Sequence, residues 1–412
     1  MWELIRANKR NSIILMVIMA AVLLLLGYII GLAAVGPQGG LFGIIIATIV
    51  YLLLTLVSFS SGDQILLAAS KAVPITHDVH PQLFNIVEEM KIAAALPAMP
   101  KIYIINDPAP NAFATGRNPQ SASVAVTAGL LTRLNRDELQ GVVAHEISHI
   151  HHRDILFVTL AGIMLGSIVL LSQVFLRGMF YGSRGSSRRR YSSGGKGGGQ
   201  AQIILLVIAI AAAILAPIMA QLLYFALSRR REYLADAGGA ILTRYPEGLA
   251  SALEKIANDP SPQLASANKV TAPMYIVNPF KKRGQMQLSN LTSTHPPISE
   301  RIRILRNMAG ASFKDYSDSF TSVTHTKSVI PPAALTKEEI ALREAAKEAE
   351  KKERLEKQIH QVGDIMRRVN RFIFLTCICG LNLKIPPNYK RPTVECPRCH
   401  RILDIPPAVS KK

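Results

Sequence analysis

Four long uncharged stretches constrain this chain more than any other feature of its sequence. Each is predominantly apolar and close to the ~20 residues that a helix needs to cross a bilayer. They cover residues 13–35, 41–59, 155–176 and 203–227. The first is too long for the apolar region of a cleaved signal peptide, and no A-x-A site follows it. We therefore predict an integral membrane protein with four transmembrane helices.

The segment "GVVAHEISHIHHRD" (141–154) contains the pattern H-E-x-x-H directly before the third apolar stretch. On a helix, His145 and His149 lie on one face and Glu146 lies at the edge of that face. Two imidazoles on one metal ion, with a carboxylate that takes a proton from water, form a metallopeptidase site. His152 is roughly 10 Å further along the helix axis than His145, too far to share the ion. This short pattern also arises by chance. The metal interpretation therefore needs support from a third ligand elsewhere in the chain.

The segment "SRRREYLAD" (228–236) supplies a candidate, because Glu232 and Asp236 are again four residues apart. Glu232 as the third ligand, with Asp236 accepting a hydrogen bond from a ligating imidazole, suits a zinc site with one position open for water. The alternative is a solvated acidic pair that balances the three neighbouring arginines. Two membrane crossings between His149 and Glu232 would bring both to the same side of the membrane.

Basic residues near the membrane ends predict the orientation of the chain. The N-terminal tail and residues 229–231 are basic, whereas the loop 36–40 carries no charge. This places the site on the cytoplasmic side of the cell membrane. The loop 177–199 disagrees, because its six basic residues would lie outside. Two explanations stay open: the metal site overrides the local charge, or the third and fourth stretches form a hairpin that does not fully cross.

Composition agrees with a membrane protein that has soluble parts. The chain of 412 residues is 49% hydrophobic and carries a formal net charge of +19. A nucleic acid is a less favoured partner than the lipid bilayer, because the basic residues flank apolar stretches and suit anionic headgroups. No glycine motif that cradles phosphate is present.

The region between the second and third stretches predicts a small sheet among helices. Helical periodicity covers 80–96 and begins again at 135, where Asn135 or Asp137 is the expected cap, and strand patterns cover 101–107 and 121–131. Between the strands lies "NAFATG" (111–116). It is either an extended segment to which a peptide substrate adds as another strand, or an ordinary turn.

All four cysteines lie near the C-terminus, after a charged, helix-favouring segment (336–372). Cys377 and Cys379 form C-x-C, and after sixteen intervening residues Cys396 and Cys399 form C-P-x-C. This spacing is close to that of a zinc ribbon, and reduced cytosolic thiols favour a metal over disulfides. The short C-x-C leaves iron binding, or partial use of His400, open. With Tyr389 as its one stacking residue, the ribbon is expected to dock a protein partner rather than a nucleic acid.

Five separated motifs carry a family resemblance over roughly residues 1–310. They are "NAFATG", "VAVTAGLLTRL", "DELQGVVAHEISHIHHRD", "SRRREYLAD" and "STHPPISERI". In this order among apolar stretches they resemble the integral-membrane zinc endopeptidases that include the heat-shock protease HtpX and the CAAX prenyl proteases, and are closer to the former. The resemblance implies a gluzincin-type site in which Zn²⁺ is bound by His145, His149 and Glu232, with Glu146 as general base.

The same resemblance implies further roles. His295 in "THPP" is similar to a residue that stabilises the oxyanion, and Arg301 to a helper near it. Asn111 and Ala112 are similar to edge-strand residues that contact the substrate backbone. Taken from the residues alone, His295 is a histidine that flanks a helix.

Together these observations predict an α+β membrane protein with a mainly helical catalytic domain bearing a small sheet. The expected parts are an N-terminal helix pair (1–62), a metalloprotease domain (63–335), a charged helical linker (336–372) and a zinc-ribbon-like module (373–412). The expected activity is zinc-dependent endopeptidase action on misfolded or damaged membrane proteins. The alternatives are a catalytically silent membrane scaffold that recruits partners through the ribbon, and a membrane-tethered nucleic-acid binder.

Overall fold

The structure is a computed structural model of the chain, and it describes most of the sequence. The described residues are 2–182, 198–260, 275–277, 295–335, 340–344, 373–386, 389 and 391–405.

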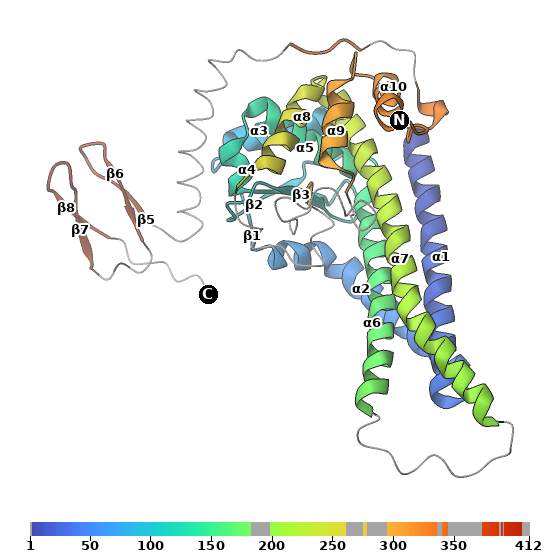
Figure 1. The fold of residues 1–412 in the computed structure, drawn as a ribbon. Helices are drawn as coiled ribbons and strands as arrows, with labels where there is room; N and C mark the ends of the chain where they lie inside the picture. Colours follow the sequence, from blue (N-terminus) through green and yellow to red (C-terminus); the bar gives the residue numbers. More distant parts are fainter. Residues whose placement is uncertain are drawn as a thin grey trace.

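Each of the four apolar stretches lies within a long helix. Helices α1 (Trp2–Val35) and α2 (Gly39–Ala69) form an antiparallel pair, and α6 (Asp154–Gly182) and α7 (Gly198–Thr243) run beside it (Figure 1). Their shared core is apolar and takes residues from all four helices: Leu15, Met19, Leu23 and Leu26 from α1, Ala47 from α2, Met164 and Ile168 from α6, and Ala213, Ala220 and Tyr224 from α7. The remaining apolar side chains of these helices are largely exposed, as expected for a surface that faces lipid.

Three helices in the described part of the chain are long and apolar enough to cross a membrane. Their apolar segments are Ile5–Val35, Gly39–Val57 and Ile203–Thr243. Helix α6 contributes a shorter apolar segment, Met164–Gly178. The prediction of several apolar helices is confirmed, whereas the count of four spans stays a prediction. Helix α7 contains Pro217 and continues as a helix on both sides of it.

A mixed four-stranded sheet follows the C-terminal end of α2. Its order is β1-β2-β4-β3, formed by β1 (Ala72–Pro74), β2 (Lys101–Ile105), β4 (Ser123–Thr127) and β3 (Ala112–Thr115). Strands β2 and β4 are parallel, and the other two pairs are antiparallel. The segment "NAFATG" therefore contains an edge strand, and the reading of it as an ordinary turn is wrong.

One predicted strand is too long. The pattern at 121–131 suggested a strand throughout, but β4 ends at Thr127 and α4 (Ala128–Arg133) follows it. Thr127 ends the strand because its hydroxyl accepts a hydrogen bond from Leu130 N and so caps the helix.

Helices cover one face of the sheet and form the main core with it. Figure 1 shows α3 (Pro81–Ala93), α5 (Arg136–His151) and α8 (Pro246–Asn258) above the strands. Asn135 starts α5 with a capping box in which its side chain accepts from Glu138 N and the Glu138 carboxylate accepts from Asn135 N. Asn135, rather than Asp137, is thus the cap. Two further helices, α9 (Ile298–Arg306) and α10 (Phe313–Thr324), and a short 3₁₀ turn, η2 (Pro332–Ala334), complete this part.

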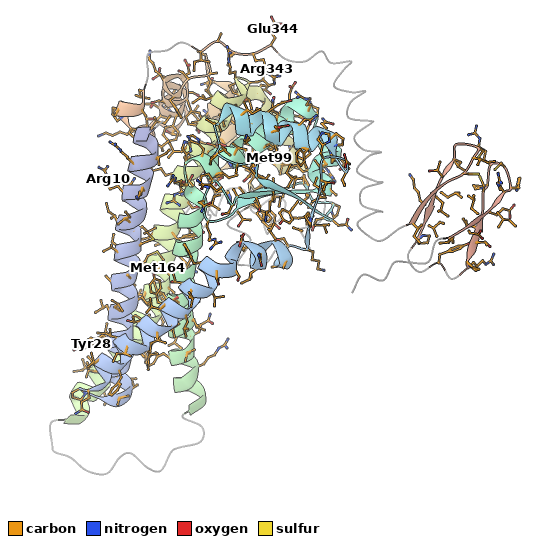
Figure 2. The ribbon with its side chains drawn as sticks, turned by 180° about the vertical axis from the view of Figure 1, so that it is seen from behind. Arg10, Tyr28, Met99, Met164, Arg343 and Glu344 are labelled. Carbon is orange, nitrogen blue, oxygen red and sulfur yellow. The ribbon has the colours of Figure 1, made fainter. Side chains whose placement is uncertain are left out.

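Five described residues after this domain lie against it. Ala311 N donates to Ile340 O at 2.9 Å, and Arg343 Nη2 donates to Asp137 at the start of α5 at 2.8 Å. Arg343 and Glu344 lie at the end of the molecule opposite the α1–α2 turn (Figure 2). These residues, 340–344, are irregular. The other residues of the predicted helical linker, 336–339 and 345–372, lie outside the described part of the chain.

Residues 373–405 contain two short hairpins. The first pairs β5 (Ile373–Thr376) with β6 (Asn382–Ile385), and the second pairs β7 (Thr393–Glu395) with β8 (Ile402–Asp404). Each hairpin places one cysteine pair at its turn end, as in the knuckles of a zinc ribbon.

Candidate metal centre

Helices α5 and α7 bring together the three side chains that the sequence pattern singled out. His145 Nε2 lies 3.7 Å from Glu232 Oε2, and His149 Nε2 lies 3.5 Å from Glu232 Oε1. One ligand atom from each residue falls within 4.8 Å of the others. Glu232 is thus beside the two histidines and is not a solvated acid, so the interpretation of Glu232 and Asp236 as an exposed acidic pair is wrong.

Two glycines allow these helices to approach each other closely. A Cβ atom on Gly238 of α7 would lie 2.0 Å from Ser148 Oγ of α5, and one on Gly239 would lie 3.2 Å from His145 N. A larger residue at Gly238 would have to displace the side chain of Ser148 on α5. The pair "GG" therefore sets the helix spacing that lets Glu232 reach the histidines, a signal that the sequence reasoning did not use.

A second set of carboxylates holds the outer nitrogens of the two imidazoles. Asp236 Oδ1 lies 2.9 Å from His145 Nδ1, and Asp154 Oδ2 lies 3.2 Å from His149 Nδ1. These contacts orient both Nε2 atoms toward Glu232. Asp154 also lies 3.8 Å from Arg231 Nε, so its carboxylate faces a guanidinium as well as His149.

Arg301 of α9 locks the carboxylate that holds His145. Its Nε and Nη2 each donate to Asp236 at 2.7 Å, and its Nη1 lies 3.4 Å from Glu232 Oε2. Arg301 and Asp236 are fully buried. A bidentate pair of this kind fixes the carboxylate geometrically as well as electrostatically. Arg301 is therefore a part of the site rather than a neighbour of it.

Glu146 faces the same space from α5 and is almost fully buried. Burial raises the pKa of its carboxyl to about 7, and the amide of Ala114 on β3 hydrogen-bonds to it. A carboxyl with a pKa near neutrality exchanges protons readily at physiological pH, as a general base requires.

The histidines of the site differ in charge. At His149 burial is outweighed by the carboxylates of Asp154 and Glu232, which raise its pKa to about 10. Burial dominates at His145 and His295. It lowers the pKa of His145, and it lowers the pKa of His295 to about 4. His295 stands just before α9, with its Nε2 atom 3.8 Å from Glu232 Oε2. Neutral imidazole is the form that binds a metal ion or donates a single N–H.

Two other histidines of the cluster have structural partners. His152 Nδ1 lies 3.2 Å from Ser148 Oγ, and His151 Nδ1 lies 2.9 Å from the carbonyl oxygen of Ala94. Neither joins the metal-ligand group among the described residues, which agrees with the exclusion of His152 by its distance along the helix.

Asn111 and Ala112 lie at the outer edge of the sheet and already have partners. Ile276 N donates to Ala112 O at 3.0 Å, and Asn111 Nδ2 donates to Val277 O at 2.9 Å. Arg301 Nη1 donates to Ile276 O at 3.1 Å. Asn111, Ala112 and Arg301 thus all hydrogen-bond to the backbone of Ile276 or Val277.

The donor set fits a zinc ion. His145 Nε2 and Glu232 Oε2 are buried and have no hydrogen-bond partner within the described part of the chain. Such atoms are costly to bury unless something else satisfies them. Two imidazole nitrogens and one carboxylate are a set that catalytic zinc takes, with its fourth position open.

The cysteines form a second group. Cys377 and Cys399 have their sulfur atoms 3.4 Å apart, and those of Cys379 and Cys396 are 3.6 Å apart. All four sulfurs lie within 4.8 Å of one another. Four sulfurs bound tetrahedrally to zinc at about 2.3 Å would be separated by similar distances. His400 is instead paired with Glu395 at 2.9 Å.

These features define a class: a membrane metalloprotease with an H-E-x-x-H helix and a glutamate from a second helix. The chain belongs to Peptidase family M48, whose family model matches residues 78–309. It is 47% identical over 308 residues to a Protease HtpX homolog of Dictyoglomus thermophilum, covering 74% of this chain and 94% of that protein. For the homolog of Caldanaerobacter subterraneus subsp. tengcongensis the identity is 44%, covering 75% and 98%.

A third Protease HtpX homolog, from Lactobacillus helveticus, is 41% identical over all of its own length and 75% of this chain. About a quarter of this chain therefore has no counterpart in that relative, and the cysteine group lies beyond the end of the family match at residue 309. The crystal structure of S. mikatae Ste24p aligns with 74% of this chain and 67% of its own at 20% identity, with a TM-score of 0.40.

Proposed function

We propose that this metalloprotease is an endopeptidase whose zinc ion is held by His145, His149 and Glu232. The observation that carries the proposal is the convergence of their ligand atoms within 4.8 Å, beside a buried glutamate with a pKa of about 7. When bound there, zinc supplies Lewis acidity, which polarises a peptide carbonyl and lowers the pKa of water. Asp236 and Asp154 keep the ligating imidazoles in the required tautomer.

Glu146 acts as the general base in this proposal. Its carboxylate takes a proton from the attacking water and returns it to the leaving amine. The hydrogen bond from the Ala114 amide keeps the carboxylate turned toward the edge of β3, where the scissile bond would lie. Glu146 does not need to hold the metal, so its loss would stop catalysis without emptying the site.

His295 is proposed to donate a hydrogen bond to the developing oxyanion. Its low pKa keeps the ring neutral, with one N–H available, and its Nε2 atom lies 3.8 Å from Glu232. Donors of this kind contribute a few kcal/mol to transition-state stabilisation in other enzymes. Arg301 positions Asp236 and also reaches a backbone carbonyl at the edge strand.

Asn111 and Ala112 are proposed to bind the substrate backbone. Ala112 O points away from β4 at the sheet edge, and the Asn111 side chain offers both a donor and an acceptor to an adjacent strand. An extended peptide would add there as a further strand.

The substrates are proposed to be misfolded or damaged proteins of the cell membrane, cleaved on its cytoplasmic side. Support comes from helix α7, which carries both an apolar segment and Glu232, so that the site stands close to the bilayer. The basic residues at the N-terminus and at 229–231 favour the cytoplasmic side.

The four cysteines are proposed to hold a second zinc ion that stabilises the two hairpins. A closed site of four thiolates has no open position, so its role is structural. The module then serves to dock a protein partner, beside a catalytic unit that does not depend on it.

Zinc content and cleavage of casein by the detergent-purified chain test the proposal. We expect two zinc ions per chain and cleavage that a chelator abolishes. A chain that binds zinc at His145, His149 and Glu232 yet cleaves neither casein nor a membrane protein would instead be a membrane scaffold.

A further inference from the structure

Residues Tyr275–Val277 lie along the outer edge of β3 as a short irregular segment. Ile276 N donates to Ala112 O at 3.0 Å, and Val277 pairs with the next residue back, Asn111. Asn111 Nδ2 donates to Val277 O at 2.9 Å, and Val277 N donates to Asn111 Oδ1 at 3.4 Å. Because the pairing runs from 112 with 276 to 111 with 277, the two segments point in opposite directions.

This segment covers the otherwise free edge of β3 next to Glu146, the proposed general base. Ala112 and Ala114 present their backbone groups to the same outer edge, since alternate residues of a strand face the same neighbour. The Ala112 carbonyl accepts a hydrogen bond from Ile276 N, and the Ala114 amide donates one to the Glu146 carboxylate. A polypeptide strand that reached Glu146 along this edge would need the hydrogen bonds that Ile276 and Val277 now make.

The segment is also tied to the side chains around the metal ligands. Arg301 Nη1 donates to Ile276 O at 3.1 Å, while the same guanidinium holds Asp236 behind His145. The Arg301 side chain therefore links the backbone of Ile276 to the candidate metal centre. Backbone atoms alone make these contacts, so other sequences could take the same place.

The two neighbouring side chains fill separate apolar spaces. Tyr275 is fully buried on the face toward α2, where its ring packs edge-on against Phe113 at 5.1 Å and its hydroxyl lies 3.4 Å from Ser70 Oγ. Ile276 is buried in the main core with the helices on the other face. The edge thus accepts an aromatic residue followed by a branched aliphatic one, on opposite faces.

We infer that Tyr275–Val277 occupies the position of a substrate strand, so that it shows the register and the side-chain class that this site accepts. The inference rests on the proposed function. Substrates would be extended segments with apolar side chains at two consecutive positions, as in unfolded membrane or core segments. The internal segment would compete with them, and binding of a substrate would require its release.

Substitution Ile276→Asp tests the competition, because a carboxylate cannot be buried at that position without a partner. If the internal segment is in place about nine-tenths of the time, its release lowers KM for a short fluorogenic peptide by roughly ten-fold and leaves kcat similar. Ile276→Val should behave as wild type. Ile92→Asp makes the same change at an exposed position of α3 and should also leave KM unchanged. An unchanged or raised KM in Ile276→Asp would mean that the segment is a permanent strand of the sheet.

Hydrogen exchange gives a readout that does not depend on turnover. The full chain with Glu146→Gln, loaded with zinc, would be saturated with the blocked peptide acetyl-Met-Tyr-Ile-Val-Asn-amide. We expect the Ile276 amide to exchange at least ten-fold faster with the peptide than without it, while the amides of β4 keep their protection. A scrambled peptide should have no effect. Protection of Ile276 that persists at saturation overturns the inference.

These two experiments separate failure of the inference from failure of the proposed function. If the zinc-loaded wild type and Ile276→Asp both cleave nothing, the endopeptidase proposal fails, yet the exchange experiment still shows whether a peptide displaces Tyr275–Val277. If wild type cleaves the peptide and neither KM nor exchange responds, the inference alone is wrong.

Discussion

Asp236 lies one turn after Glu232 on α7, and its Oδ1 atom is 2.9 Å from Nδ1 of His145, on the side of the ring that faces away from Glu232. One helix thus approaches the same imidazole from both sides, with a metal-ligand candidate on one nitrogen and a carboxylate on the other. The Asp236 carboxylate is itself held by two hydrogen bonds from Arg301.

Substitution Asp236→Asn should weaken zinc binding by about 10- to 100-fold, because the amide holds the His145 ring less strongly in its ligating tautomer. It should also destabilise the fold, because Arg301 loses its buried counter-ion. Competition with a zinc chelator measures the affinity. Glu300→Gln, on the same helix as Arg301, is the control and should leave zinc affinity as it is in wild type. Equal zinc affinity in Asp236→Asn would show that Asp236 has no role in the metal site.

Glu146→Gln and Glu232→Ala should distinguish the role of a general base from that of a metal ligand. We expect Glu146→Gln to keep both zinc ions and to lose cleavage by a factor of at least a thousand, because the base is lost and all ligands remain. Glu232→Ala should lose one zinc ion and the activity together. Metal analysis and peptide cleavage on the same samples check this. Loss of zinc from Glu146→Gln would contradict the assignment of Glu146 as a base.

Cys396→Ser should remove the other zinc ion and leave hydrolysis of a short peptide within about two-fold of wild type. The reason is that its thiolate belongs to a group that lies beyond the family match. Ser312→Ala, at the cap of α10, is a control for a general loss of stability. If Cys396→Ser stops peptide hydrolysis while zinc stays at the first site, the cysteine module is a part of the catalytic unit.

His80 should make the stability of the catalytic domain depend on pH. Its Nδ1 accepts a hydrogen bond from Leu83 N at the start of α3, so the ring must be neutral, and burial lowers its pKa from 6.5 to about 4. A histidine with a lowered folded-state pKa contributes full stability above pH 6.5 and loses it as the pH falls from 6.5 toward 4.

His80→Asn keeps a capping acceptor without a titrating group. Between pH 7 and pH 4.5, wild type should therefore lose on the order of 2 kcal/mol more unfolding free energy than this variant. Denaturant unfolding of the zinc-free chain in detergent, followed at both pH values, measures the difference. Parallel losses in the two proteins would show that His80 titrates normally.

The α1–α2 turn and the catalytic domain should lie on opposite sides of the membrane. In chains without the four native cysteines, Gln38→Cys and Asp259→Cys place single thiols in the turn and after α8. An impermeant maleimide added to whole cells should label the first and spare the second. Labelling of Asp259→Cys from outside would reverse the proposed orientation.

Much of the candidate metal centre could be predicted because its side chains come in pairs one helical turn apart. His145 with His149, and Glu232 with Asp236, need only the assumption of a helix to share a face. The same is true of Asn135, whose cap is visible as an asparagine three residues before Glu138. Local spacing carries this information directly.

Other parts depend on contacts between distant segments, and local patterns did not predict them. No local pattern indicates that Ile276 lies on Ala112, or that Asp154 reaches His149 across a helix boundary. Gly238 is visible as a glycine, but its need for close packing depends on which helix lies opposite. Strand β3 was ambiguous because its four residues are all buried and show no alternation.

Helix α7 carries both an apolar stretch and Glu232. Glu232 follows the end of the apolar stretch 203–227 by five residues, which is about 7.5 Å along the helix axis. The helix therefore sets the distance between the bilayer and the peptide bond that the proposed site would cleave. We expect a membrane-anchored substrate to be cleaved at a nearly constant number of residues from the end of its own span, and that number should shift when the same protein works in a thicker or thinner bilayer.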